Sequence, residues 1–239
     1  MACREATSTN AVALALAAQG APEGSVVVAD YQAAGRGRQG RAWMAPPGTG
    51  LLVSVLLRPA CQPQRIPPIS LVSAVACREA LALSGVEAHL KWPNDVFLHG
   101  KKLGGILLEA ISAGVGRPAV VVGIGLNLHQ RREEFPPALR ERATSVVVAT
   151  GRHLDRADVL ALLLSSLDRW YRTYLEDGFA PVREAWLDGA LGLGQWVRLD
   201  GQGKGGIMAG RVLDLDRNGS LILEAPGGRR LTVYAGEIS

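Results

Sequence analysis

The chain has 239 residues, of which 48% are hydrophobic, so it can bury a sizeable core in one large domain or in a medium domain and a small one. Its formal net charge is only +4, from 26 basic and 22 acidic residues, which argues against a nucleic-acid partner unless positive charge is concentrated locally. Its three cysteines show no CxxC spacing, which indicates neither a disulfide framework nor a cysteine zinc site and fits a reducing cytoplasm.

We find no targeting or membrane-spanning signal in the sequence. The N-terminus lacks the basic start, apolar run and cleavage site of a signal peptide. The apolar run at 50–57 is far shorter than the about 20 apolar residues that cross a bilayer. We therefore expect a soluble, cytoplasmic protein with no membrane partner.

The first part of the chain alternates helical and strand patterns. A helix is predicted over 8–19, because polar Ser-Thr-Asn precedes an alanine- and leucine-rich run and a glycine follows it. Short apolar runs predict buried strands at 26–29 and 51–57. Apolar residues at helical spacings predict a largely buried helix over 69–83, which a Ser-Gly pair ends.

Strands and then helices follow along the chain. Three apolar runs predict strands at 96–98, 103–109 and 120–128. His99–Gly100 makes a tight connection between the first two of them. Asp155 and Asp158 are typical of a helix start, and the leucine cluster after them predicts a helix to Tyr174. A second, short helix is predicted around 181–187.

The composition and periodicity of the sequence change near residue 191. Glycines become dense, helical periodicity ends, and alternating patterns predict strands at 196–199, 208–215, 220–223 and 231–234. Asp216–Gly219 carries an Asn-Gly hairpin signal, and Pro226–Gly228 is a second turn. We therefore expect a boundary near residue 190, between a larger α/β domain at 1–189 and a small β-barrel at 190–239.

The most unusual segment is QAAGRGRQGRAW, from Gln32 to Trp43. Its glycines satisfy the dinucleotide fingerprint GxGxxG, but two prolines and a glycine follow where a helix should begin, which disfavours a Rossmann site. A nucleic-acid-binding tract is also disfavoured, because the segment is one short copy between apolar strands. The remaining interpretations are a solvated surface loop and a mobile lid, in which Arg36, Arg38 and Arg41 close over a bound phosphate or carboxylate.

Two further segments place polar residues among apolar strands. KWPNDVFLHGKKLGGILLE, from Lys91 to Glu109, presents an amide and a carboxylate on a rigid Trp-Pro-Asn-Asp turn. Lys101 and Lys102 begin its apolar strand, where a lysine can neutralise a reacting phosphate, although solvated lysines on a β-hairpin are the more common case. GIGLNL ends a strand with Asn127, and its glycines permit close approach of a ligand to the backbone. The sequence contains no Walker A, GxSxG or paired-histidine motif.

Taken in order, STN, YQAAGRGRQGRAW, KWPNDV, KKLGGILLE and GIGLNL resemble the motifs of the biotin-protein ligase family over nearly the whole chain. The resemblance implies an α/β (α+β) fold: a catalytic domain with a mixed sheet, similar to class II aminoacyl-tRNA synthetases, followed by a small SH3-like β-barrel. It also implies a two-step ligase. The biotin carboxylate attacks the α-phosphate of MgATP to give biotinyl-5′-AMP, and a lysine of a biotin carboxyl carrier protein then displaces AMP.

By matching position, the resemblance implies roles for individual residues. Those expected at biotin are Ser8, Thr9, Asn10, Gln32, Gly35, Arg36, Gly37, Arg38, Lys102 and Gly105. Those expected at ATP or the adenylate are Arg36, Arg38, Arg41, Trp43, Lys91, Asn94 and Asn127. Lys102, Asp95 and Arg38 are expected to be catalytic, with Lys102 as the main electrostatic catalyst and Asp95 orienting or deprotonating the incoming lysine. Mg²⁺ is expected to be carried by ATP, without a protein metal site.

Two alternative functions stay open at this point. A lipoate ligase shares the fold but lacks the arginine-glycine loop together with KWPND. A non-catalytic biotin-binding module is disfavoured by Lys102 and Asp95. Some family members carry a DNA-binding domain before the Ser-Thr-Asn motif, whereas seven residues precede Ser8 here, so we expect neither a repressor role nor a nucleic-acid partner. The expected oligomeric state is a monomer or a homodimer.

Overall fold

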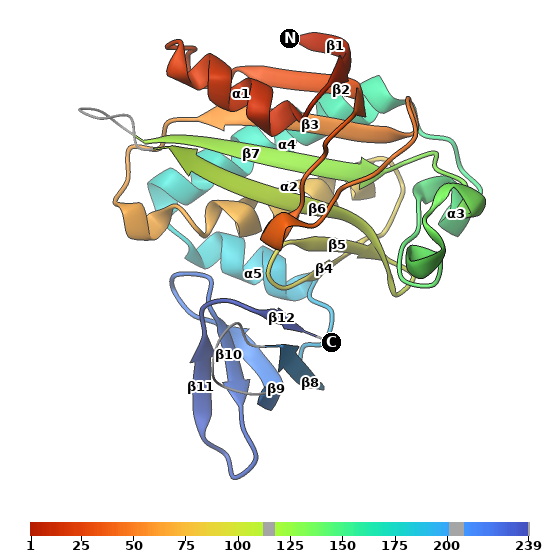
Figure 1. Cartoon of the computed structure of the whole chain (residues 1–239). Helices are drawn as coiled ribbons and strands as arrows, with labels where there is room; N and C mark the ends of the chain where they lie inside the picture. Colours follow the sequence, from red (N-terminus) through yellow and green to blue (C-terminus); the bar gives the residue numbers. More distant parts are fainter. Residues whose placement is uncertain (112–117, 201–207, 239) are drawn as a thin grey trace.

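The computed structural model describes residues 1–111, 118–200 and 208–238. The larger part of the fold is built on a seven-stranded sheet in the order β1-β2-β3-β7-β6-β5-β4 (Figure 1). Its strands are β1 (Ala2–Ala6), β2 (Val26–Gln32), β3 (Gly50–Leu57), β4 (His89–Lys91), β5 (Asp95–Leu98), β6 (Lys101–Ile111) and β7 (Ala119–Asn127). β1 and β2 run parallel, and the other neighbours in this sheet are antiparallel, so the sheet is mixed.

Different helices cover the two faces of this sheet (Figure 1). Side chains alternate along a strand, so Leu56 and Val55 of β3 point to opposite faces. Leu56 packs with Ala13 and Ala17 of α1, which spans Thr9–Ala18. Val55 belongs to the main core on the other face. That face is covered by α2 (Ile69–Leu83), α4 (Arg156–Asp177) and α5 (Ala180–Asp188).

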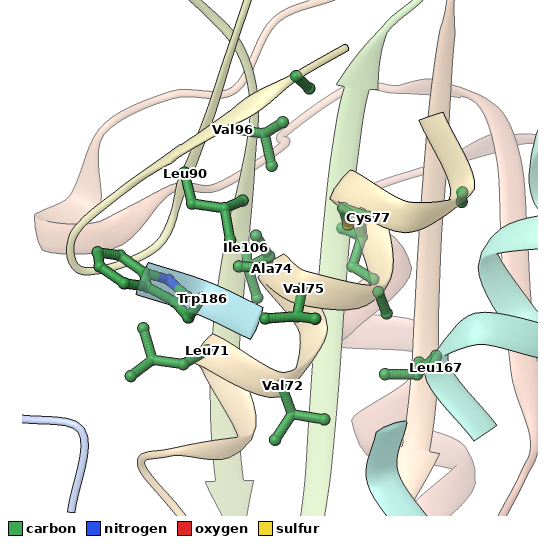
Figure 2. Packing of buried hydrophobic residues seen from close by; sticks show 14 of the residues in the cluster. Leu71, Val72, Ala74, Val75, Cys77, Leu90, Val96, Ile106, Leu167 and Trp186 are labelled. Atoms are coloured by element: carbon green, nitrogen blue, oxygen red, sulfur yellow. The ribbon is translucent and has the colours of Figure 1, made fainter. Parts of the chain in front are cut away.

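The main core is centred on α2. Figure 2 shows Leu71 and Val75 of this helix among side chains of the sheet and the neighbouring helices, including Ile106 and Trp186. By length and composition alone, the stretch Pro63–Leu83 is apolar enough to cross a membrane, and 61% of its apolar window is buried inside the fold. Its hydrophobicity is explained by this position between the sheet and the other helices.

Most predicted elements agree with the structure, and the helix predicted at 69–83 matches α2 residue for residue. The strand predicted at 26–29 continues to Gln32, and the helix predicted to end at Tyr174 continues to Asp177. β1, β4 and the short α3 (Val146–Thr150) are not predicted from the sequence. Among the described residues of this part, 3₁₀ turns lie at Arg38–Gly40, Pro63–Arg65, Arg132–Glu134 and Pro137–Leu139.

A second, antiparallel sheet follows in the order β11-β10-β9-β8-β12. Its strands are β8 (Trp196–Asp200), β9 (Met208–Leu215), β10 (Leu221–Glu224), β11 (Arg230–Val233) and β12 (Glu237–Ile238). The hairpin turns predicted at Asp216–Gly219 and Pro226–Gly228 join β9 to β10 and β10 to β11. β12 is not predicted, because two residues are too few to show a pattern.

The second sheet packs directly against the larger part (Figure 1). Leu215 and other buried residues of this sheet belong to the same hydrophobic cluster as α2. The Trp92 indole N–H donates a hydrogen bond of 3.0 Å to the carbonyl of Gly219. Arg183 of α5 forms an ion pair with Asp214 of β9. The KWPND turn therefore touches the hairpin between β9 and β10.

Candidate active site

The residues singled out in the sequence gather on the α1 face of the sheet. Gly125 and Asn127 of β7 share this face with Val121, which packs under α1, because alternate residues of a strand point the same way. Gly105 pairs with Gly125 on one side and with Asp95 on the other, so the β5 and β6 residues face the same way. In Figure 1, the segment between β2 and β3 crosses this face toward β5.

The Ser-Thr-Asn segment begins α1 and is buried. The Thr9 N–H and hydroxyl both donate hydrogen bonds to Gln32 Oε1, at 2.7 and 3.0 Å. Ser54 of β3 is fully buried, and its hydroxyl lies 2.7 Å from Thr9 Oγ1 and 2.6 Å from Asn10 Oδ1. Ser8 is the N-cap residue, but its hydroxyl caps no backbone N–H and has no partner among the described residues. The predicted start of the helix is correct, but the Ser8 side chain does not cap it.

Asn10 is held by residues that sequence analysis did not single out. Its Nδ2 donates to Glu109 Oε2 at 2.7 Å and to the carbonyl of Leu107 at 3.3 Å. Gly123 makes room for it, since a Cβ there would overlap its amide group. Both amide hydrogens of Asn10 therefore have protein acceptors in this structure. The space left by Gly123, the first glycine of GIGLN, is therefore occupied by the Asn10 side chain.

The arginine-glycine segment forms a narrow hairpin-like loop, which we call the lid (residues 35–43). Arg36 and Ala42 form an antiparallel bridge, and Trp43 N–H donates to the carbonyl of Gly35 at 2.9 Å. The turn uses left-handed backbone at Gln39 (φ 58°) and Gly40 (φ 73°). No helix follows the GxGxxG pattern, in agreement with the rejection of a Rossmann site.

Each lid arginine contacts a different element. Arg36 Nη2 lies 3.3 Å from Glu109 Oε1 of β6. Arg38 Nη1 donates to Asn94 Oδ1 at 3.1 Å, and Asn94 is fixed because its Nδ2 donates to the carbonyl of Ile106 at 2.6 Å.

Arg41 reaches the second sheet. Its Nη2 lies 2.7 Å from Glu237 Oε2 of β12, and this hydrogen bond raises the pKa of the guanidinium further above its ordinary value. The side chains of Arg41 and Glu237 are both partly exposed. The lid is therefore tied to β6, to the KWPND turn and to the second sheet. Contact between the lid and β12 is not foreseen from the sequence.

Trp43 ends the lid and lies against β7. A Cβ on Gly125 would lie 2.6 Å from Trp43 Cε2, so the indole depends on a glycine at that position. The indole Nε1 is buried and has no hydrogen-bond partner among the described residues. This leaves a flat aromatic group on the α1 face with one unused donor, which suits contact with a planar heterocycle.

Lys102 and Asp95 form the central ion pair of the site. Lys102 Nζ lies 2.7 Å from Asp95 Oδ1, and both side chains are partly buried. Gly105 leaves space beside them, since a Cβ there would meet Asp95 Oδ1 and Lys102 Cε at 3.5 Å. Lys91 pairs with Asp95 across β4 and β5, and its ammonium lies 5.0 Å from the ring centroid of Phe97. The structure thus brings Lys91 to the same sheet face, next to this pair.

Asn127 lies at the end of β7 and is nine-tenths or more buried. Its Nδ2 donates to the carbonyl of Thr144 at 3.1 Å. Thr144 N–H in turn donates to the carbonyl of Lys102 at 2.9 Å. Asn127 therefore fixes the chain segment that flanks Lys102, in addition to any contact with phosphate oxygens.

Among the described residues, the cations on this face are Arg36, Arg38, Arg41, Lys91 and Lys102. Arg36, Arg41 and Lys102 are each paired with a carboxylate, whereas Arg38 is paired with the neutral amide of Asn94. Arg38 therefore has the least compensated charge of the lid and is suited to bind an anion. Residues 1–111, 118–200 and 208–238 contain no group of three or more His, Cys, Asp or Glu side chains that could hold a metal ion.

Comparison with known proteins agrees with this architecture. Residues 2–127 match the family model described as the biotin/lipoate A/B protein ligase family, and residues 192–239 match the model of the biotin protein ligase C terminal domain. The chain is 41% identical to a biotin--[acetyl-CoA-carboxylase] ligase of Paracoccus denitrificans over 94% of this chain and 93% of the relative. It is 38% identical to the bifunctional ligase/repressor BirA of Bacillus subtilis, over 97% of this chain and 71% of that protein.

Solved structures give the same result for the fold. The biotin protein ligase from Aquifex aeolicus in complex with biotin and ATP superposes with a TM-score of 0.86 at 31% sequence identity. The match covers 100% of this chain and 97% of the other. The expected fold class, a mixed-sheet α/β domain followed by a separate small β domain, is thereby confirmed. On the family match and these similarities, the chain belongs to the biotin/lipoate A/B protein ligase family.

Proposed function

We propose that this chain is a biotin-protein ligase, which uses MgATP to make biotinyl-5′-AMP and transfers biotin to a lysine of a biotin carboxyl carrier protein. Its similarity to a biotin--[acetyl-CoA-carboxylase] ligase over nearly all of both chains supports this function. The observation that carries it is the Lys102–Asp95 ion pair at 2.7 Å, beside an arginine-rich lid on one sheet face. That arrangement suits a reaction between two anions.

We assign the biotin ring to the polar residues at the start of α1. Gln32 Oε1 already accepts from Thr9, which leaves Gln32 Nε2 as a donor. Ser8 is a buried residue whose hydroxyl has no partner among the described residues, so this hydroxyl can donate to or accept from a ureido group. Asn10 completes this group of residues at the ring, and its side chain is held in place by Ser54 and Glu109. The Gly35 and Gly37 backbone and Gly105 line the way to the carboxylate.

The first step joins the biotin carboxylate to ATP. A carboxylate oxygen attacks the α-phosphorus, the bond to the bridging oxygen of pyrophosphate breaks, and pyrophosphate leaves. Lys102 and Arg38 lower the repulsion between the two anions and stabilise the charge that develops at phosphorus. Mg²⁺ bound to the triphosphate supplies further charge neutralisation. Arg36 and Arg41 hold the lid over the reactants, and water is kept from the mixed anhydride.

The adenylate is held on the same face. The Trp43 indole offers a stacking surface to adenine, with Lys91, Asn94 and Asn127 at the edge of the phosphate site. In the second step, the amine of the acceptor lysine attacks the acyl carbon, the acyl–phosphate bond breaks and AMP leaves. Asp95, next to Lys102, orients the amine and takes its proton.

The remaining parts of the proposal concern organisation and partners. We divide the chain into a catalytic domain at 1–189 and an SH3-like domain at 190–239. The partner is the carrier protein or carrier domain of a biotin-dependent carboxylase, and the enzyme acts in the cytoplasm as a monomer or homodimer without nucleic acid. The family model also covers lipoate ligases, so a lipoate ligase and a non-catalytic biotin-binding module are the alternatives to be tested.

One experiment separates these functions. The protein is incubated with ATP and Mg²⁺ and with biotin or lipoate, and the acyl-AMP is identified by mass spectrometry. Biotinyl-AMP is expected; lipoyl-AMP alone would indicate a lipoate ligase, and biotin binding without an adenylate would indicate a binding module.

The role of Lys102 is tested by a matched pair of variants. Lys102→Ala should lower the rate of adenylation by about 10²–10³-fold, the range for removal of one electrostatic group at a reacting centre. Lys101→Ala removes the neighbouring lysine, which pairs with the exposed Glu141, and should leave the rate unchanged. Equal rates for both variants would reject the assignment.

A further inference from the structure

Glu109 links the two parts of the proposed biotin site. Its Oε2 accepts from Asn10 at the start of α1, and its Oε1 pairs with Arg36 at the base of the lid. Asn10 is joined through Ser54 to Thr9, and Thr9 to Gln32. A continuous series of polar contacts therefore runs from β2 to the lid. Glu109 ends the KKLGGILLE motif, but neither the sequence analysis nor the proposed mechanism gives it a role.

The chemistry of these contacts requires a carboxylate. Both groups that face Glu109, the Asn10 amide nitrogen and the Arg36 guanidinium, are donors only. Two carboxylate oxygens satisfy both at once. A glutamine of the same shape would offer one oxygen and one NH₂ group, so one of the two donors would face another donor. The arrangement is thus specific for Glu at this position.

Arg36 lies at the base of the lid, so its contact with Glu109 affects the position of the whole loop. Arg36 and Ala42 form the bridge that closes the base of the lid, next to Gly35, whose carbonyl accepts from Trp43 N–H. Holding the Arg36 side chain on β6 therefore holds the base of the loop on the sheet. Asn10 fixes the other oxygen of the same carboxylate, and its amide group occupies the space that a side chain at position 123 would take.

We propose that Glu109 is a positioning residue that fastens the lid to the proposed biotin-ring site, at the start of α1, through Arg36 and Asn10. Because the ring site and the lid share this carboxylate, a ligand that orders the start of α1 also orders the lid base. Glu109 does not touch the reacting atoms. This inference rests on the proposed function for its effect on catalysis, but the attachment of the lid can be measured without ligand.

The test compares Glu109→Gln with Asp188→Asn. The control makes the same acid-to-amide change in an exposed ion pair with Arg78, outside the site. Limited trypsin digestion with peptide mapping measures cleavage after the lid arginines. In the ligand-free protein, Glu109→Gln should increase lid cleavage about fivefold, as expected for loss of a partly exposed ion pair, whereas Asp188→Asn should cleave like wild type. Equal lid cleavage in all three proteins would overturn the proposal.

A double-mutant cycle tests whether Glu109 limits lid cleavage through its contact with Arg36. If Glu109 acts through Arg36, adding Glu109→Gln to Arg36→Gln should raise lid cleavage no further. A full fivefold increase in that background would also overturn the proposal.

The catalytic consequence is the rate at which biotinyl-AMP escapes when no acceptor protein is present. Glu109→Gln should release it about fivefold faster at a similar thermal midpoint, which a purely structural role would not produce. If biotinyl-AMP left the variant at the wild-type rate, Glu109 would hold the lid only in the ligand-free protein, and its positioning role in the reaction would be contradicted. If wild type makes no biotinyl-AMP, the proposed function fails, while the digestion result still decides whether Glu109 fastens the lid.

Discussion

Replacement of Gly123 with alanine tests whether a buried polar network holds the first turn of α1. Gly123 lies within β7 and is paired with Ser54 on one side and Leu107 on the other, so its backbone is held from both directions. A Cβ there would overlap Asn10 Oδ1 and lie 2.8 Å from Asn10 Cγ. Because the strand is fixed, the Asn10 side chain has to turn away.

The cost follows from the contacts that Asn10 would lose. They are its hydrogen bonds with the Ser54 hydroxyl, the Leu107 carbonyl and the Glu109 carboxylate. Each such bond contributes about 1 kcal/mol, and a buried group left unpaired costs more, so we expect the free energy of unfolding to fall by about 3 kcal/mol. Guanidinium denaturation measures this value, and the shared core of the two sheets predicts a single transition.

The matched control is Gly37→Ala. A Cβ on Gly37 would meet the Arg41 carbonyl oxygen at 3.5 Å, an ordinary contact, and the backbone there is extended (φ −109°). Its stability should stay within about 0.5 kcal/mol of wild type or rise slightly, because alanine restricts the unfolded chain. If Gly123→Ala were as stable as this control, Asn10 would not be held by the network described, and the reasoning would be refuted.

Three further changes are expected to have separable effects. Gly125→Ala should displace Trp43 and raise the KM for ATP about tenfold with little change in biotin affinity; an unchanged KM would remove the indole from the nucleotide site. Glu237→Gln should loosen Arg41 and raise the KM for ATP by about threefold, as for loss of an exposed ion pair, and a neutral result in kinetic assays would contradict this link. Burial raises the pKa of the Cys77 thiol from 9.0 to about 12, so iodoacetamide should not label it at pH 8 until the protein unfolds. Between pH 9 and about 12 the folded protein keeps the Cys77 thiol proton, whereas the unfolded chain loses it. The contribution of Cys77 to the free energy of unfolding is therefore fully present below pH 9 and falls between pH 9 and about 12. A free energy of unfolding that rises over this interval would contradict the assignment.

The sequence predicts the elements whose signals are local. The apolar spacing of 69–83 and the Ser-Gly stop define α2 at both ends. The His99–Gly100 turn is correct because both residues adopt the positive φ angles that a tight hairpin needs. β1 is missed because Ala2–Ala6 carries no apolar run and becomes a strand through parallel pairing with the distant β2. β4 is missed because three residues cannot show a period.

The same distinction applies to the site. The charged and polar motifs contain Arg38, Lys102 and Asp95, and the roles expected for these residues come from the resemblance to the family. Ser54 lies inside an apolar strand without any motif, and Glu109 ends the KKLGGILLE motif, but nothing in either segment shows which residue it contacts. Their partners are tens of residues away in the chain and are found only when the strands are in register. The GIGLN glycines are recognised as points of close approach, but the groups that approach are side chains of this chain.

The second sheet affects the site from two directions. β12 brings Glu237 to Arg41 of the lid, while the turn between β9 and β10 accepts the indole N–H of Trp92 from the KWPND turn. The lid and the KWPND turn are joined to each other by Arg38 and Asn94. The three parts therefore form a closed ring of contacts, in which displacement of any one disturbs both of its neighbours. Since its buried residues also continue the core around α2, the second sheet is a structural component of the site and not an independent attachment.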